Sequence, residues 1–160
     1  PSRGLGDVYK RQAPYLLERA QIYMNNDQAR NAMLDYDAYY KAVNGQVNDL
    51  FYYYREQAAL KARQYQRALD DIVKAVELSP KDLTYRAEHA VVNLRVGRYE
   101  ESMKILNEIL KDEPKYGEAY RLLGLCQIQL KKTDEACGNF NKAKELGDPN
   151  VDELIKKYCK

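Results

Sequence analysis

The chain has 160 residues and carries 26 basic and 24 acidic side chains, so its formal net charge is only +2. This length fits one domain of ordinary size. No run of apolar residues approaches the roughly 20 that a membrane-spanning helix needs. The near balance of charge also argues against nucleic acid as a partner, although the chain has 15 tyrosines that could stack on bases.

The first twelve residues are predicted to lie outside the fold. The stretch SRGLGDVYKRQ, Ser2 to Gln12, has no helical or strand period. Its back-translation matches the adapter of a transposase-based sequencing library over eleven consecutive codons. We interpret residues 1–12 as a translated adapter in front of a gene fragment, with a native basic arm as the alternative. Setting aside their three basic and one acidic side chains leaves 23 of each charge, a neutral chain.

From Ala13 onward the sequence repeats at an interval of 34 residues. The interval relates four sets of positions: Pro80, Pro114 and Asp148; Ala68, Ser102 and Ala136; Tyr65, Tyr99 and Thr133; Ile72, Leu106 and Phe140. An earlier repeat aligns with these after a two-residue insertion near NGQVND. We therefore expect four repeats, over residues 13–46, 49–82, 83–116 and 117–150.

Each repeat is predicted to be a pair of helices. In the second repeat, four apolar residues follow the spacing i, i+4, i+7 and i+8 of one helix face: Ala68, Ile72, Ala75 and Val76. The preceding helix ends near Ala62, the helix with this face begins near Tyr65, and Pro80 stops it. Small residues are expected where paired helices come closest: Ala20 and Ala32 in the first repeat, Gly124 and Ala136 in the fourth.

The interval, the helix pairs and the small residues together resemble the tetratricopeptide repeat (TPR), over residues 13–150. The fourth repeat matches the family's signature best, at Tyr120, Leu123, Gly124, Ala136, Phe140 and Ala143. Sel1-like helix hairpins are the nearest alternative, but their longer period disfavours them. The resemblance implies an all-α fold, a right-handed superhelical solenoid of four antiparallel helix-turn-helix repeats. A capping helix over residues 151–159, with Leu154 and Tyr158 at i and i+4, is predicted to complete one TPR domain, residues 13–160.

The resemblance also implies a binding surface, because the first helix of each repeat lines the concave face of such a solenoid. By this analogy a groove for a peptide or a helix is lined by Leu50, Tyr53, Gln57, Leu60, Lys61, Val91, Leu94, Arg95, Arg121, Leu125 and Ile128. The first repeat adds Leu17, Gln21 and Met24. The Lys, Asn and Arg clamp with which one TPR subclass binds a C-terminal carboxylate is absent. The alternative is that these residues pack against missing repeats or close the superhelix.

No pattern in the chain points to catalytic residues, a cofactor or a metal. His89, the only histidine, is expected to be partly buried in a helix, and Cys126 is expected in the core. A catalytic dyad would need a base or an acid held within hydrogen-bond reach, and nothing in the spacing requires that. The three cysteines form no CxxC pair, so a zinc site is not expected.

Two ion pairs are predicted from positions that change together between the repeats. Arg19 and Arg55 share one repeat position, and Asp35 and Asp71 share another sixteen residues later. Both positions lose their charge in the later repeats. A half-buried arginine needs a carboxylate partner, so we expect each arginine to bind the aspartate of its own repeat, with coincidence as the alternative.

A disulfide between Cys137 and Cys159 is a further hypothesis. Cys137 opens the second helix of the fourth repeat, and Cys159 closes the terminal helix, which should run antiparallel beside it. The start of one helix then lies near the end of the other. Such a bond would indicate an oxidising compartment, whereas the alternative is two ordinary free cysteines on helix faces.

These patterns indicate a non-enzymatic scaffold that binds a protein or peptide ligand. A function of another class also fits the sequence, namely the C-terminal regulatory array of a larger enzyme or envelope protein whose N-terminal part is missing. A hydrolase that uses His89 is a weaker third hypothesis. If residues 1–12 are an adapter, further repeats of the same chain are expected upstream. The compartment, cytoplasmic or periplasmic, then stays open.

Overall fold

The computed structural model describes residues 3–159, with side chains described from residue 12 onward. In this part of the chain all regular secondary structure is α-helical. The chain divides into two compact units, residues 1–79 and 80–160. The unit boundary falls directly after the fourth helix, close to the predicted end of the second repeat at residue 82, so each unit holds two complete helix pairs.

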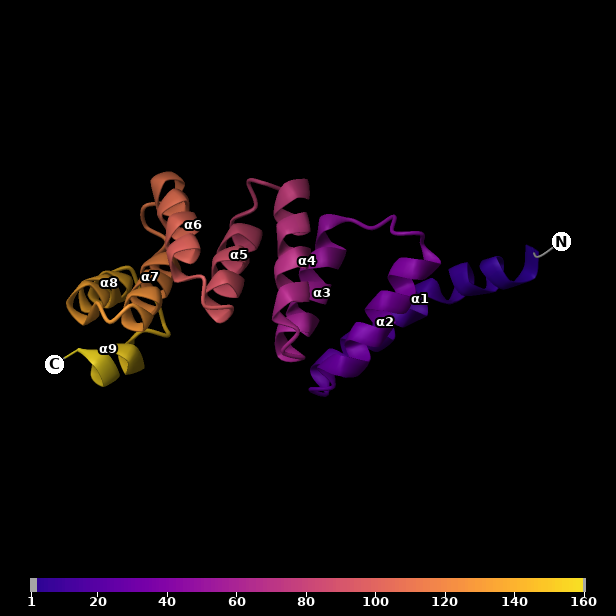
Figure 1. Cartoon of the computed structure of the whole chain (residues 1–160), viewed down its shortest axis with the longest axis horizontal. Helices are drawn as coiled ribbons and strands as arrows, with labels where there is room; N and C mark the ends of the chain where they lie inside the picture. The colour runs from indigo at the N-terminus through magenta and orange to yellow at the C-terminus, as the bar shows by residue number, and fades with distance from the viewer. Residues whose placement is uncertain (1–2, 160) are drawn as a thin grey trace. The chain divides into compact units, whose positions relative to one another are not determined.

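In the first unit, two helix pairs pack side by side. α1 (Arg3–Asn25) packs along α2 (Ala29–Ala42), and α3 (Asp49–Lys61) packs along α4 (Tyr65–Leu78) (Figure 1). The two pairs are joined because α3 also packs on α2. The side chain of Asn48 accepts a hydrogen bond from the backbone N–H of Phe51 at 3.0 Å. This cap satisfies a free donor of the first turn and sets the start of α3.

The second unit contains two helix pairs and a short terminal helix. α5 (Leu83–Arg95) packs along α6 (Tyr99–Asp112), and α7 (Gly117–Gln129) packs along α8 (Thr133–Glu145). α7 also packs on α6, and α9 (Asp152–Tyr158) lies against α8. Buried side chains of α5, α6 and α7 form one apolar cluster, so the second pair is built onto the first.

The helix pairs lie where the repeat pattern predicts them. α3 ends at Lys61 and α4 begins at Tyr65, within one residue of the predicted limits. α4 ends at Leu78, shortly before Pro80, and α9 occupies the predicted capping segment. The all-α fold class, with four helix pairs and a terminal helix in the described residues, is therefore confirmed.

The beginning of α1 differs from the prediction. The helix begins at Arg3 and continues through Pro14 to Asn25. Residues 3–12 are thus helical although their sequence shows no helical period. Extending an existing helix by one residue adds one backbone hydrogen bond and restricts the backbone of that residue alone. α1 continues in this way past the end of the shorter α2 (Figure 1). Residues 1 and 2 lie outside the described part of the chain, and the adapter origin of residues 1–12 stays a prediction.

Small residues allow the paired helices to come close, as predicted. Ala20, Ala32 and Ala136 are fully buried. At Gly124, an added Cβ atom would overlap the ring of Phe140, so glycine leaves the room that this ring needs. In α3 the same position holds Glu56, which is also fully buried.

Both predicted arginine–aspartate pairs are present. Arg19 donates two hydrogen bonds to Asp35, at 2.7 and 2.6 Å. Arg55 donates two to Asp71, at 2.8 and 2.7 Å. Burial disfavours the charge on Arg55, but the bonds to Asp71 outweigh it and hold the pKa of the guanidinium above its ordinary value. Each bidentate pair joins the two helices of one repeat.

The turn between the two helices of each repeat contains one residue in the left-handed conformation. The φ angle is positive at the same position of all four repeats: 55° at Asp27, 60° at Arg63, 81° at Gly97 and 61° at Lys131. Only glycine adopts this conformation without a steric penalty. Three of the four turns therefore carry the strain of a side chain at this position.

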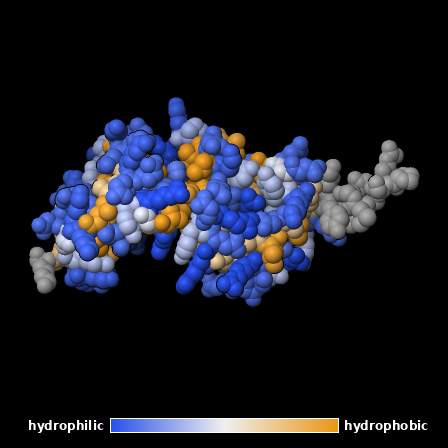
Figure 2. Space-filling model, viewed as in Figure 1, coloured by the Kyte–Doolittle hydropathy of each residue, from blue (hydrophilic) through white to orange (hydrophobic). Residues whose placement is uncertain are grey.

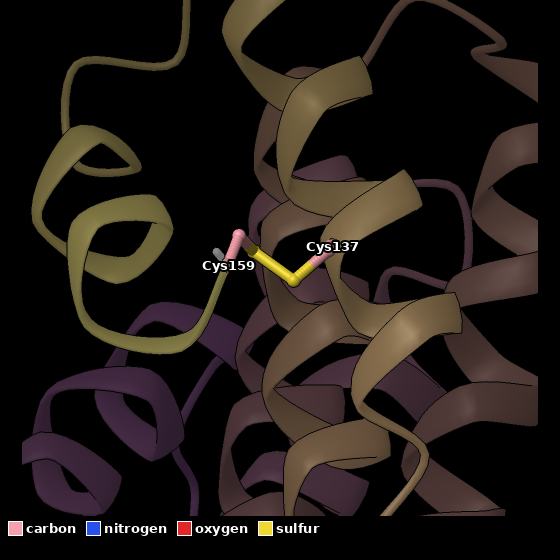
Figure 3. Close-up of a disulfide and its surroundings, with 2 residues drawn as sticks. All are labelled: Cys137 and Cys159. Carbon is pink, nitrogen blue, oxygen red and sulfur yellow. A yellow bond between two sulfur atoms is a disulfide. The ribbon is translucent and has the colours of Figure 1, made fainter.

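The terminal helix covers one side of the last helix pair. Its residues Leu154, Ile155 and Tyr158 pack against a buried cluster that includes Phe140 of α8. Cys137 of α8 and Cys159, directly after α9, are joined by a disulfide, with their Cα atoms 5.6 Å apart (Figure 3). The bond closes a loop with a sequence separation of 22 residues and ties the end of α9 to α8.

Candidate peptide-binding surface

The eleven residues predicted to line a groove lie on α3, α5 and α7, and none of them is fully buried. On α3, Leu50 and Lys61 are exposed, and three others are half-buried: Tyr53, Gln57 and Leu60. They alternate with the buried residues of this helix, Phe51, Glu56, Ala58 and Ala59. Most of the surface seen in Figure 2 is hydrophilic, with apolar side chains in scattered patches. The predicted face of α3 is accessible to a ligand.

A hollow of about 660 Å³ lies in the first unit, where α1, α2 and the start of α3 meet. It is lined by Leu17, Gln21, Tyr36, Tyr39, Gln46, Val47, Asn48, Leu50, Phe51 and Tyr54. Leu17 and Gln21 are one turn apart on α1, as are Leu50 and Tyr54 on α3. Each of these two helices therefore offers one face to the hollow.

The lining of this hollow is aromatic and uncharged. The ring of Phe51 lies 5.8 Å from that of Tyr36 and 5.4 Å from that of Tyr39, and Tyr54 adds a fourth ring. Burial raises the pKa of Tyr36 to about 12, so its hydroxyl group stays protonated at neutral pH. Besides the tyrosine hydroxyl groups, the polar side chains of the lining are amides. The hollow can therefore take an apolar side chain and offer neutral hydrogen-bonding groups around it.

Part of this lining was missed by the sequence prediction, which considered only the first helices of the repeats. Tyr36 and Tyr39 belong to α2, and residues 46–48 belong to the connection between α2 and α3. A signal was present in the two-residue insertion near NGQVND, because a longer connection leaves more backbone beside the start of the next helix. Its position beside a group of tyrosines could have indicated the hollow.

The predicted residues of the second unit differ in their freedom to bind a ligand. On α5, three are half-buried or exposed: Val91, Leu94 and Arg95. Arg121 of α7 binds Asp148 at 3.0 Å and Glu118 at 2.8 Å, and its side chain is mostly buried. The charge of Arg121 is therefore used within the repeat. Its main role in the structure is to hold α7 to the turn after α8.

Leu125 and Ile128 of α7 are shared between the predicted surface and the core. Both pack against the buried cluster that α9 covers, and Leu125 also contacts the cluster of α5, α6 and α7. Each is half-buried, so only part of its side chain remains accessible. Of the predicted residues, those beside the hollow in the first unit thus have the clearest access to a ligand.

The residues weighed for chemistry lie in ordinary structural positions. His89 is half-buried, and burial lowers its pKa, so the ring is neutral at physiological pH. Cys126 is fully buried, as predicted, and burial raises the pKa of its thiol. Among the side chains that the structure describes, from residue 12 to residue 159, no three His, Cys, Asp or Glu residues are grouped as metal ligands would be. No helix within residues 3–159 has the length and apolar character for crossing a membrane.

A protein-family model identifies the fold. The model of the anaphase-promoting complex, cyclosome, subunit 3 matches residues 25–109, which are more than half of the chain. The chain belongs to this family of tetratricopeptide-repeat proteins. The match begins at the end of α1 and ends within α6, so TPR sequence extends into both units of the structure.

A solved structure matches more of this TPR chain. The crystal structure of YrrB, described as a TPR protein with an unusual peptide-binding site, aligns with a TM-score of 0.78. The alignment covers 91% of this chain and 74% of YrrB at 19% sequence identity. At that identity the likeness establishes the fold, and it agrees with the solenoid class predicted from the repeats.

Curated relatives match about three fifths of this chain. Small glutamine-rich tetratricopeptide repeat-containing protein 2 of Mycosarcoma maydis is 29% identical over 99 residues, which are 62% of this chain and 28% of that protein. Serine/threonine-protein phosphatase T of Aspergillus oryzae is also 29% identical over 99 residues, 62% of this chain and 20% of that protein. This TPR chain thus spans less than a third of the length of either relative.

Proposed function

We propose that this TPR chain is a non-enzymatic interaction module that binds a peptide or a helix of another protein. The observation that carries the proposal is the aromatic hollow formed by α1, α2 and α3. Ligand pockets typically have volumes of about 300–1,000 Å³, a mostly apolar lining and a few polar groups, and the hollow has all three properties. YrrB, which shares the fold, is described as having a peptide-binding site, and this supports a peptide as the ligand class.

The proposed surface continues from the hollow along the accessible face of α3, through Tyr53, Gln57, Leu60 and Lys61. The accessible parts of Val91, Leu94, Arg95, Leu125 and Ile128 form a separate candidate surface of the second unit. Since the lining of the hollow carries no charge, it suits an aliphatic or aromatic anchor residue of the ligand. An acidic C-terminal tail finds no basic clamp there. Affinity should therefore depend on one buried anchor in the hollow, with weaker contacts along the helices.

The experiment is a selection from a displayed library of random peptides on the full chain. Leu50→Lys and Tyr54→Lys place a charge at the hollow from exposed positions, and each should weaken the selected peptide at least about tenfold. Leu34→Lys is the control, because Leu34 of α2 is also an exposed apolar residue, at 68% against 44% for Leu50 and 42% for Tyr54, but does not line the hollow. The proposal would be contradicted if Leu34→Lys abolished binding while Leu50→Lys and Tyr54→Lys did not. It would also be contradicted if the library yielded no peptide.

A second candidate function is favoured by one relative. Phosphatase T of Aspergillus oryzae combines a region similar to this chain with a much longer polypeptide. By this analogy the chain is a regulatory array within a larger enzyme. The sequence hypothesis places this array at the C-terminal end of a larger enzyme or envelope protein. The gene sequence upstream of the codon for Ala13 separates the two candidates. A catalytic domain or a secretion signal there would favour the regulatory array, whereas further repeats would favour the scaffold.

A further inference from the structure

The terminal helix α9 is too short to be stable as a helix by itself. It has seven residues, and isolated helices shorter than about 12–15 residues are marginal in water. None of the seven is fully buried, although Leu154, Ile155 and Tyr158 pack partly on the apolar cluster beneath them. An ion pair joins Lys144 of α8 to Asp152, but both side chains are 61% exposed, so it adds little stability. The position of α9 therefore depends on what holds its two ends.

The two ends of α9 are held in different ways. At the beginning, Val151 is fully buried directly before the helix. Asp148, in the turn that leads to it, binds Arg121 of α7 at 3.0 Å. At the other end, the bond between Cys137 and Cys159 bridges α8 and the end of α9 (Figure 3). Breaking this bond would free the end of α9 while its beginning stays attached, so Val151 is placed as a hinge.

A reductant can reach this bond. Cys137 and Cys159 are each half-buried, so part of each residue contacts solvent. At Gly138, the next residue of α8, an added Cβ atom would meet no atom within 4 Å, so the surface beside Cys137 is open. Cys126 is instead fully buried in the cluster of α5, α6 and α7. The bond is thus accessible from outside and separated from the third cysteine, which favours reversible opening over exchange of partners.

The side chains that α9 covers are apolar. The ring of Tyr158 stacks on that of Phe140 of α8, with the ring centres 6.4 Å apart. Leu125 and Ile128 of α7, which belong to the candidate surface of the second unit, pack against the same cluster. If α9 turned away, part of this cluster would face solvent beside the accessible parts of Leu125 and Ile128. The position of α9 thus sets how much apolar surface the last helix pair exposes.

We propose that α9 is a redox-controlled cover on the apolar side of the last helix pair. While Cys137 and Cys159 are bonded, α9 is closed over the cluster around Phe140. When a protein or small-molecule dithiol reduces the bond, α9 turns away about Val151 and uncovers this cluster. The cover is then closed in an oxidising compartment and open in a reducing one. It belongs to the second unit and the peptide-binding hollow to the first, so this proposal and the proposed function can fail separately.

The chemical step is a two-electron thiol–disulfide exchange. A thiolate of the dithiol attacks one sulfur of the bond, forms a mixed disulfide with it and expels the other sulfur as a thiolate. The second thiolate of the dithiol then attacks the mixed disulfide, releases the remaining cysteine sulfur and closes the reductant's own disulfide. The two protons of the dithiol end on Cys137 and Cys159. The protein gains two electrons, the dithiol is oxidised, and a disulfide oxidant reverses the reaction.

The test compares the amide hydrogen exchange of α9 in the oxidised and the reduced full chain, with dithiothreitol as the reductant. Mass spectrometry follows peptides that contain residues 152–158. We expect these amides to exchange at least about tenfold faster after reduction, because opening of α9 no longer has to work against the bond. Amides of α3 and α4, in the other unit, should exchange at one rate in both states. Reoxidation with oxidised glutathione should restore the slow exchange of α9.

Matched cysteine variants separate the bond from other effects of the reductant. Cys159→Ser cannot form the bond and should show fast exchange of α9 with and without dithiothreitol. Cys126→Ala keeps the bond and should respond to dithiothreitol as the parent does. In the reduced, folded parent, maleimide should label Cys137 and Cys159 while Cys126 stays unreactive. That pattern would show that α9 opens while the rest of the second unit remains folded.

Three results would overturn the proposal. Equal exchange of residues 152–158 in the oxidised and reduced parent would show that apolar packing alone keeps α9 closed. Labelling of Cys126 after reduction, or fast exchange throughout α5 to α8, would show that the bond supports the whole unit and that α9 is not a movable cover. Faster exchange of α9 on adding dithiothreitol to Cys159→Ser would assign the effect to the reagent and not to the bond.

Discussion

Arg55 and Asp71 form the more buried of the two arginine–aspartate pairs, and this determines how strongly the two side chains should depend on each other. Arg55→Ala and Asp71→Ala each leave a charge behind in a largely buried position. We expect the double variant to be less destabilised than the sum of the single variants, with a coupling energy of about 1–3 kcal/mol. Urea unfolding of the four proteins measures it. Coupling between Arg19 and Asp35 should be smaller, because Arg19 is more exposed to water. Additive effects at Arg55 and Asp71 would contradict this interpretation.

Gly124 and Gly138 lie inside neighbouring helices but should respond to alanine in opposite ways. Alanine in place of glycine favours a helix by about 1 kcal/mol. At Gly124 the new methyl group overlaps the ring of Phe140, and such overpacking costs about 1–3 kcal/mol, so Gly124→Ala should lower stability. At Gly138 the methyl group meets no atom within 4 Å, so Gly138→Ala should raise stability by about 0.5–1 kcal/mol. Thermal unfolding compares the two, and the opposite order would show that the helices are not in close contact at Gly124.

The turn between the two helices of a repeat contains a residue with a positive φ angle, and its backbone strain can be tested by substitution. Lys131 has a φ of 61° at the position where Gly97 has 81°. A side chain in this conformation costs about 1–2 kcal/mol, and glycine loses part of that gain to its greater freedom in the unfolded chain. Lys131→Gly should therefore stabilise the protein by about 0.5–1 kcal/mol in urea unfolding. Gly97→Ala is the matched reverse change and should destabilise it. A Lys131→Gly variant less stable than the parent would show that the turn is not strained.

The terminal helix α9 is short, so its stability should depend on the bond that holds its end. In the chain-entropy model, closing a loop of this length contributes on the order of 3 kcal/mol. Cys137→Ser and Cys159→Ser should each lower the free energy of unfolding by a similar amount, and a dithiol reductant should affect the parent but neither variant. Thiol titration of the unfolded, unreduced parent should find one free cysteine, Cys126. A titration that finds three would rule out the disulfide in solution and remove the argument for an oxidising compartment.

The chain as a whole is close to electrically neutral, with a formal net charge of +2. A nucleic-acid-binding domain would instead carry a basic face whose contacts weaken with salt. We therefore expect no retention on heparin at an ionic strength of about 0.15 M, where surface charges more than about 8 Å apart are screened. Removing residues 1–12 should not increase retention, because they carry a net positive charge. Elution only at high salt would contradict this prediction and reopen the question of a polyanionic partner.

Much of the fold could be predicted because the repeats contain their own contacts. The limits of α4, the close approach at Gly124 and the pairing of Arg55 with Asp71 all involve residues of a single repeat, at separations that recur along the chain. A periodic sequence shows such contacts directly. The helical start of α1 was not predictable in this way, because residues 3–12 belong to no repeat. They are helical as an extension of the helix that continues from Ala13 to Asn25.

The sequence alone determined the repeat length, the helix pairs and the residues that join two helices of one repeat, since these depend on short-range spacing. The tertiary structure decided what lies between one repeat and the next. The lining of the hollow by Tyr36 and Tyr39 and the exposure of Tyr15 both depend on which neighbouring element is present. Burial is a property of two packed surfaces, so a period of 34 residues can indicate which face of a helix is apolar but not what covers it.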